Sequence, residues 1–121
     1  MMRSVLNVVV VDDHVGFRKL ARQLLEQIGH QVVGEAATGT DALHQVRRLK
    51  PDVVLLDVQL PDFDGLTVAA ALTSWKGAPA VLLVSARDAA DFGPRLTSCG
   101  AIGFIAKADL SADALTRLLD R

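Results

Sequence analysis

Apolar residues in this chain gather into two kinds of segment that alternate along its length. Short runs such as Val8–Val11, which lack polar alternation, are typical of strands covered on both faces. Longer segments that place apolar residues at helical spacing follow these runs. The pattern predicts strands at 5–11, 31–37, 53–57, 80–85 and 102–106, and helices at 15–28, 41–49, 65–75, 91–99 and 111–120.

Glycine and proline residues refine the helix ends. Gly29 stands where a left-handed C-terminal cap is expected, and Pro51 should stop the second helix at residue 49. Gly93-Pro94 falls inside the fourth helical segment, and proline is tolerated only in a first helical turn. We therefore expect a short helix that starts near Pro94, after a long, loose connection over 86–93.

Five strand–helix repeats without a linker predict a single α/β domain over residues 1–121. Such repeats form a doubly wound parallel five-stranded sheet with helices on both faces. On the first helix, the cationic side chains lie opposite the apolar stripe, so we expect a solvated face there; it comprises Arg18, Lys19 and Arg22.

Composition narrows the class of protein. A hydrophobic fraction of 50% with 22% charged residues excludes a disordered chain, and a net charge of −1 excludes the broad basic surface of a nucleic-acid binder. The apolar runs are far shorter than the ~20 residues of a membrane-spanning helix, and the N-terminus resembles no signal peptide. Cys99 is the single cysteine, so no internal disulfide can form and a cytoplasmic location is expected.

Reactive side chains follow the predicted strands. The first strand ends in Asp12-Asp13, the third in Asp57, the fourth in Ser85, and the fifth runs into Lys107. Because the carboxyl ends of parallel strands meet at one sheet edge, with neighbours ~4.8 Å apart, these groups should come together.

Three carboxylates at such short distances repel one another unless protons or a cation neutralise them. Oxygen ligands favour a hard ion such as Mg²⁺ over zinc. A carboxylate that faces a cation, an ammonium and a hydroxyl suits phosphoryl transfer, in which the carboxylate attacks phosphorus to give an aspartyl phosphate. His14 beside the acidic pair is interpreted as structural, because a lone histidine at a helix start is more often so than a ligand.

The chain resembles the response-regulator receiver domain of two-component signalling from Val5 to about Leu119. Four motifs in order carry the resemblance: Asp12-Asp13-His14, the stretch 54–65 that contains Asp57, Val84-Ser85-Ala86, and 103–107. The opening motif and the lysine without a following proline look most like receivers of LuxR-type helix-turn-helix regulators. The resemblance implies the flavodoxin-like strand order 2-1-3-4-5.

The resemblance also implies roles for individual residues. Asp57 would accept a phosphoryl group from the phosphohistidine of a sensor histidine kinase or phosphotransfer protein. Ser85 and Lys107 would hold that group, and Phe104 with Ser85 would report it to an output domain or effector protein. The implied Mg²⁺ ligands are Asp12, Asp13, Asp57 and the main-chain carbonyl of Gln59.

Two departures from the family pattern bear on the output. Ala108 follows Lys107 where many receivers have a cis proline, and Phe104 lacks the hydroxyl of the commoner tyrosine. We expect a phosphorylation-dependent change in the face formed by the fourth helix, fifth strand and fifth helix, with homodimerisation through that face. Gly93-Pro94 is expected to alter it.

Alternative functions remain open at this stage. A flavodoxin-like electron carrier needs a phosphate cradle where Asp12-Asp13 would repel phosphate, and a haloacid-dehalogenase-like phosphatase needs a second aspartate where Gln59 stands. The serious alternative is a receiver that acts as a phosphorylation-independent interaction module. In either receiver form, we expect a signalling domain rather than a turnover enzyme, either free-standing or cut from a longer regulator.

Overall fold

The computed structural model describes residues 4–120, whose strands form one parallel sheet in the order β2-β1-β3-β4-β5. The strands are β1 (Asn7–Val11), β2 (Gln31–Ala36), β3 (Val53–Asp57), β4 (Ala80–Ser85) and β5 (Gly103–Ala106). The α-helices are α1 (Val15–Gln27), α2 (Gly39–Leu49), α3 (Gly65–Thr73), α4 (Arg95–Ser98) and α5 (Ala112–Leu119). The α/β class and the strand order 2-1-3-4-5 are thus confirmed.

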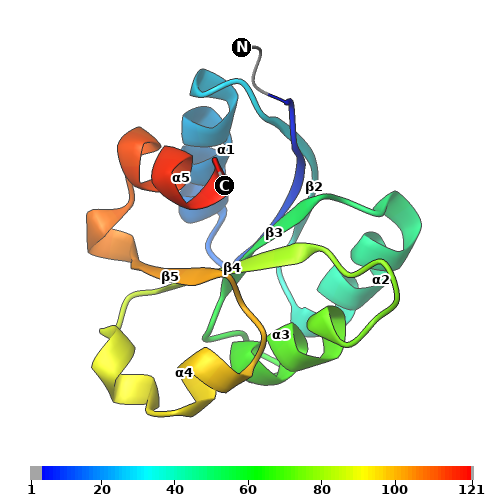
Figure 1. The fold of residues 1–121 in the computed structure, drawn as a ribbon, viewed down its shortest axis with the longest axis vertical. Helices are drawn as coiled ribbons and strands as arrows, with labels where there is room; N and C mark the ends of the chain where they lie inside the picture. Colours follow the sequence, from blue (N-terminus) through cyan, green and yellow to red (C-terminus); the bar gives the residue numbers. More distant parts are fainter. Residues whose placement is uncertain (1–3, 121) are drawn as a thin grey trace.

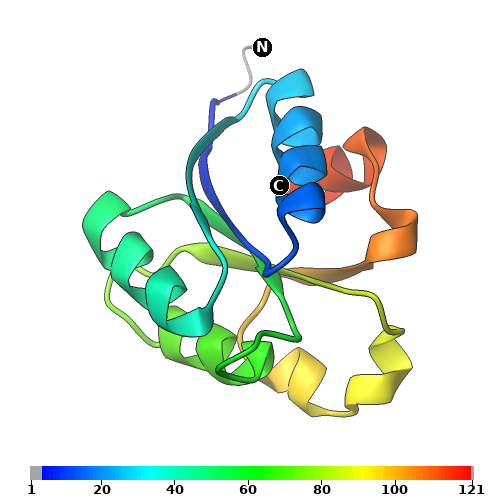
Figure 2. The same ribbon diagram turned by 180° about the vertical axis from the view of Figure 1, so that it is seen from behind.

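Two helical layers cover the sheet (Figures 1 and 2). Helices α1 and α5 pack on one face through residues such as Leu25 and Leu115, whereas α2, α3 and α4 cover the other. Successive strand side chains point to opposite faces. Val8 therefore packs on the face that α1 and α5 cover, and Val9 on the face that α2, α3 and α4 cover. The sheet is therefore buried on both sides, which explains the unbroken apolar runs.

Helix ends follow local capping. Helix α2 begins at Gly39, two residues before the predicted start, because the Thr38 hydroxyl accepts a hydrogen bond from the Asp41 amide at 3.1 Å. It ends at Leu49, as predicted, and Lys50 closes it in the left-handed conformation. Gly29 likewise has a positive φ of 90° after α1. No helix within residues 4–120 has both the length and the apolar character needed to cross a bilayer.

The fourth helix is as short as Gly93-Pro94 predicted. Helix α4 spans only Arg95–Ser98, with Pro94 at its N-cap. The connection from β4 contains one 3₁₀ turn, η1 (Ala89–Phe92). Arg95 Nη1 lies 2.8 Å from Asp64 Oδ2, so an exposed ion pair joins α4 to the start of α3. The fourth helical segment is thus a chain of short turns.

Gly65 allows α3 to start directly against the end of β3. A Cβ atom at this position would lie 2.3 Å from the Asp57 carbonyl oxygen and 2.6 Å from Val58 Cα. Both neighbours are backbone atoms and cannot rotate away. We expect Gly65→Ala to lower the free energy of unfolding by about 2 kcal/mol.

Urea denaturation would measure this loss, with Gly16→Ala as the matched control. A Cβ atom on Gly16 would meet nothing within 4 Å, so this variant should be at least as stable as the unmodified protein. Equal stability of the Gly65 and Gly16 variants would contradict the close approach of α3 to β3.

Candidate functional site

Four polar residues gather at the carboxyl edge of β1 and β3. Asp57 ends β3, and Asp12, Asp13 and His14 follow β1 directly. One ligand atom from each of the four lies within 4.8 Å of the others. Because β1 pairs with β3 in parallel, the chain must bring these ends together.

Lys107 lies between the two buried carboxylates. Its Nζ atom is 2.6 Å from Asp12 Oδ2 and 3.3 Å from Asp57 Oδ2. The same atom lies 4.4 Å from the centre of the Phe17 ring on α1, a cation–π contact. Lys107 immediately follows β5, the edge strand, so its long side chain reaches back across β4 to β3 and β1.

Burial and neighbouring charges shift the pKa values of Asp57 and Lys107. Asp57 is 3% exposed, and burial raises its pKa to about 6, reinforced by the charge of Asp12 and opposed by the Gln59 amide and by Lys107. For Lys107, burial acts to lower the pKa, but the hydrogen bond to Asp12 and the charges of both carboxylates outweigh it, so the pKa is raised. The lysine therefore stays protonated and supplies one positive charge to the acidic cluster.

The two neighbouring aspartates differ sharply. The side chain of Asp12 is fully buried, whereas that of Asp13 is 38% exposed. His14 Nδ1 lies 3.2 Å from Asp12 Oδ1 and 3.0 Å from Asp13 Oδ1, although its ring is 72% exposed. These contacts are compatible with the interpretation of His14 as structural, and its ring lies at the exposed side of the cluster.

The donor set fits Mg²⁺. Three carboxylates, two of them buried, face one lysine, so negative charge is left in excess. Hard divalent cations prefer carboxylate and carbonyl oxygens over softer ligands. The exposed Asp13 leaves the cluster open to solvent, which suits an ion that retains several waters.

The other predicted site residues are Gln59, which contacts the cluster, and Ser85 and Phe104, which have partners of their own. The Gln59 amide donates to Asp57 Oδ1 at 3.0 Å, which holds the loop after β3 against the carboxylate. Ser85 ends β4 and is fully buried, and its Oγ atom accepts a hydrogen bond from the Arg87 amide at 3.0 Å. Phe104 in β5 is half-buried, with its ring centre 6.0 Å from that of Phe92.

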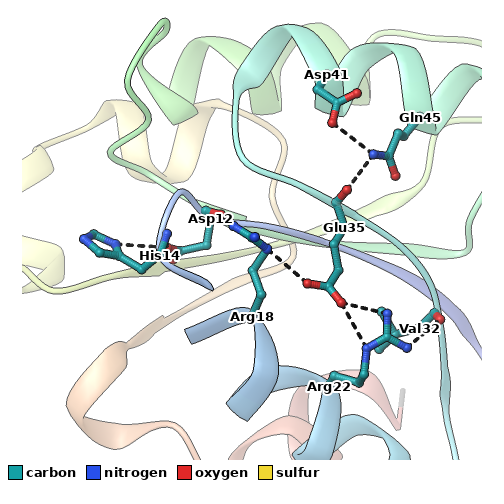
Figure 3. Close-up of polar contacts among 8 residues, drawn as sticks. All are labelled: Asp12, His14, Arg18, Arg22, Val32, Glu35, Asp41 and Gln45. Atoms are coloured by element: carbon teal, nitrogen blue, oxygen red, sulfur yellow. Dashed lines mark hydrogen bonds and ion pairs between the residues drawn. The ribbon is translucent and has the colours of Figure 1, made fainter. Parts of the chain in front are cut away.

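A second charged cluster, formed by Arg18, Arg22 and Glu35, lies next to Asp12 (Figure 3). Arg18 and Arg22 on α1 both bond to Glu35 on β2, and Arg18 Nη1 also donates to the main-chain carbonyl of Asp12 at 2.7 Å. The predicted solvated face is therefore wrong for Arg18, which is largely covered, whereas Arg22 is partly exposed and Lys19 is exposed as expected. A signal was present in the sequence: Glu35 is an acidic residue inside a predicted apolar strand.

Known proteins with the same pattern place the chain in a family. The family model for the response regulator receiver domain matches residues 8–120. A transcriptional regulator of Pseudomonas aeruginosa is 40% identical over 108 residues, which cover 89% of this chain and 52% of that protein. The chain spans about half the length of the curated transcriptional regulators that it matches.

Solved structures agree with this match. The signal receiver domain of NarL from Mycobacterium tuberculosis is 36% identical, with a TM-score of 0.84 over 98% of this chain and 100% of that one. A LuxR-family two-component response regulator from Aurantimonas is 29% identical, with a TM-score of 0.86 over 98% of this chain and 88% of that one. The chain therefore belongs to the response regulator receiver domain family and is similar to receivers of the LuxR and NarL type.

Proposed function

We propose that this domain is a phosphorylation switch in which Asp57 accepts a phosphoryl group from the phosphohistidine of a sensor histidine kinase or phosphotransfer protein. The observation that carries the proposal is the placement of Lys107 Nζ between the buried carboxylates of Asp12 and Asp57. An ordinary ion pair lies at the surface, whereas both carboxylate partners of Lys107 are buried. A lysine at this position is suited to bind the oxygens of a phosphoryl group on Asp57.

Asp57, Lys107 and Ser85 would have different roles in the phosphoryl transfer. An Asp57 carboxylate oxygen forms the new bond to phosphorus as the bond from phosphorus to the donor nitrogen breaks, and the donor imidazole keeps that electron pair. Lys107 and the Ser85 hydroxyl would then hold two of the phosphoryl oxygens. The ionised form of Asp57 is the nucleophile, so its pKa near 6 still leaves it reactive at pH 7.

Asp12, Asp13, Asp57 and the main-chain carbonyl of Gln59 would hold the magnesium ion. When bound, Mg²⁺ neutralises charge on the carboxylates and on the transferring phosphoryl group. Asp12 is anchored by Lys107 and by the sheet, whereas Asp13 is exposed and adjustable. The resemblance to receiver domains implies that Asp13 would contact the ion directly and that Asp12 would act largely through metal-bound water.

The output surface would be the face formed by α4, β5 and α5. Ser85 and Phe104 are the residues that would report phosphorylation to it, and Phe104 lines a groove of about 620 Å³ together with Asp88 and Leu118. An output domain, an effector protein or a second copy of the chain would bind there. We propose that the short α4, which follows Gly93-Pro94, alters the shape of this face.

Incubation with Mg²⁺ and acetyl phosphate, followed by intact mass measurement, tests the switch. We expect the mass of one phosphoryl group to be added to the unmodified protein and none to Asp57→Asn. Lack of labelling, under conditions that modify a control receiver, would reject the proposal and favour the phosphorylation-independent interaction module.

A further inference from the structure

We infer that Arg18 is a positioning residue that fixes the peptide between Asp12 and Asp13, and so sets the magnesium affinity of the acidic cluster. The inference rests on the proposed function, because it concerns the same site. Among residues 4–120, the hydrogen-bond partners of Arg18 are the Asp12 carbonyl and the Glu35 side chain, and not the carboxylates of the acidic cluster (Figure 3).

The Asp12 carbonyl has a particular need for this donor. Asp12 is fully buried, and its amide continues the sheet by donating to the Ala36 carbonyl at 3.0 Å. The chain then leaves the sheet for the turn into α1, and Arg18 Nη1 meets the Asp12 carbonyl at 2.7 Å. A buried carbonyl without a donor is costly, so loss of this bond would let the peptide rotate or admit water.

Arg18 is itself held in place. Its Nε atom donates to Glu35 Oε1 at 3.0 Å, and Arg22 Nη2 donates to Glu35 Oε2 at 2.7 Å. Hydrogen bonds from Arg22 and Arg18 keep the pKa of Glu35 below its usual value, although burial acts to raise it. The carboxylate therefore stays ionised, and it anchors the Arg18 guanidinium to β2, the strand beside β1.

The peptide that Arg18 holds joins the two α-carbons that carry the metal-binding carboxylates. Mg²⁺ requires near-octahedral geometry, so rotation of this peptide plane would move Asp13 relative to Asp12 and weaken binding. Groups that orient metal ligands from outside typically contribute 10- to 100-fold to metal affinity. Only a guanidinium offers the planar fork that spans a carbonyl and a carboxylate at once.

Positioning and simple charge effects make opposite predictions. Arg18 is a cation close to the site, so its charge alone opposes the binding of Mg²⁺. If charge were its only influence, Arg18→Met would bind Mg²⁺ more tightly than the unmodified protein. If Arg18 positions the turn, the same variant binds Mg²⁺ more weakly. The sign of the change therefore separates the two explanations.

Calorimetric titration of the whole protein with MgCl₂, at about 0.15 M ionic strength, measures this sign. We expect Arg18→Met to weaken Mg²⁺ binding by about tenfold. The matched control is Arg22→Met. Arg22 binds the same Glu35 carboxylate, but its hydrogen bonds do not reach the turn after Asp12. The affinity of this variant should stay within about twofold of the unmodified value, whatever its stability.

Arg18→Lys gives a second measurement that keeps the charge and also serves if the methionine variant does not fold. A lysine cannot span the Asp12 carbonyl and Glu35 in one plane, so affinity should fall several-fold. Unchanged or tighter binding by a folded Arg18 variant would overturn the inference. Failure of the unmodified protein to bind Mg²⁺ would instead overturn the proposed function, and the two failures are thereby distinguished.

Discussion

Replacement of Lys107 by methionine is expected to destabilise the metal-free protein by about 3 kcal/mol at pH 7 and to block phosphorylation. Lys107 is the cation that lies 2.6 Å from Asp12 and 3.3 Å from Asp57, and both carboxylates are buried. Methionine keeps an unbranched apolar side chain against Phe17 but leaves the two carboxylates facing each other without a counter-charge. Uncompensated buried charge is the source of the loss.

Magnesium should reverse the loss of stability but not the loss of reactivity. Without the ammonium, an added divalent cation meets less repulsion and binds the carboxylates more tightly. Thermal denaturation with and without saturating Mg²⁺ should therefore show a larger stabilisation for Lys107→Met than for the unmodified protein. The initial rate of labelling by acetyl phosphate should still fall by at least about a hundredfold, because the phosphoryl oxygens lose their ammonium partner.

Lys19→Met is the matched control for this experiment. Lys19 is an exposed lysine on α1, and its replacement should change stability by less than about 0.5 kcal/mol and labelling not at all. If Lys107→Met were as stable as this control in the absence of metal, the ion pairs of Lys107 would make no contribution to the free energy of unfolding. If it were also labelled normally, the proposed role in phosphoryl transfer would be wrong.

The convergence of the reactive residues was readable from the sequence because it follows from topology. Strand ends are marked by the first polar residue after an apolar run, and parallel strands put those ends at one edge. Asp12, Asp57 and Ser85 were found by this rule, and Lys107 because it follows the last run. Long-range geometry was not needed to place them.

The different exposures of Asp12 and Asp13 were not readable in this way. Adjacent residues at a strand end point in opposite directions, but the pattern does not say which one turns toward the sheet interior. In the structure Asp12 is fully buried and meets Lys107, whereas Asp13 is 38% exposed. Lys107, the partner of Asp12, follows the fifth strand and lies far away along the chain.

The Arg18–Glu35 pair shows a second limit of sequence patterns. A helical wheel places Arg18 opposite the apolar stripe, which ordinarily means solvent. Its side chain is instead largely covered because β2 lies beside β1 and presents Glu35 next to the carboxyl end of the strand. Local periodicity cannot register a partner that tertiary packing supplies from another element.

Asp57→Asn is expected to make the metal-free protein more stable at pH 7, by about 1 to 2 kcal/mol, while it removes the phosphorylation site. Burial raises the pKa of Asp57 to about 6, so at pH 7 the folded protein holds an ionised carboxylate that the unfolded chain accommodates more easily. Asparagine has nearly the same shape and no charge. Part of the gain is lost because Lys107 then has one carboxylate partner instead of two.

The sign of the pH dependence follows from the same pKa. A carboxyl group whose pKa is higher in the folded state binds its proton more tightly when folded, so acidification stabilises the fold in that range. Between pH 7 and pH 5 the Asp57 carboxyl should contribute about 1.4 kcal/mol of added stability to the unmodified protein. Asparagine does not titrate, so the stability difference between the two proteins should narrow by that amount.

Urea denaturation of both proteins at pH 7 and pH 5, without metal, measures this difference directly. Because the other acidic and basic groups are present in both proteins, their contributions largely cancel in the comparison. A constant difference across the two pH values would contradict the raised pKa. Added Mg²⁺ should reverse the order at pH 7, since the ion stabilises the ionised carboxylate and finds a weaker ligand in asparagine. A carboxylate that is costly without metal and favourable with it is the property that a magnesium-dependent phosphoacceptor requires.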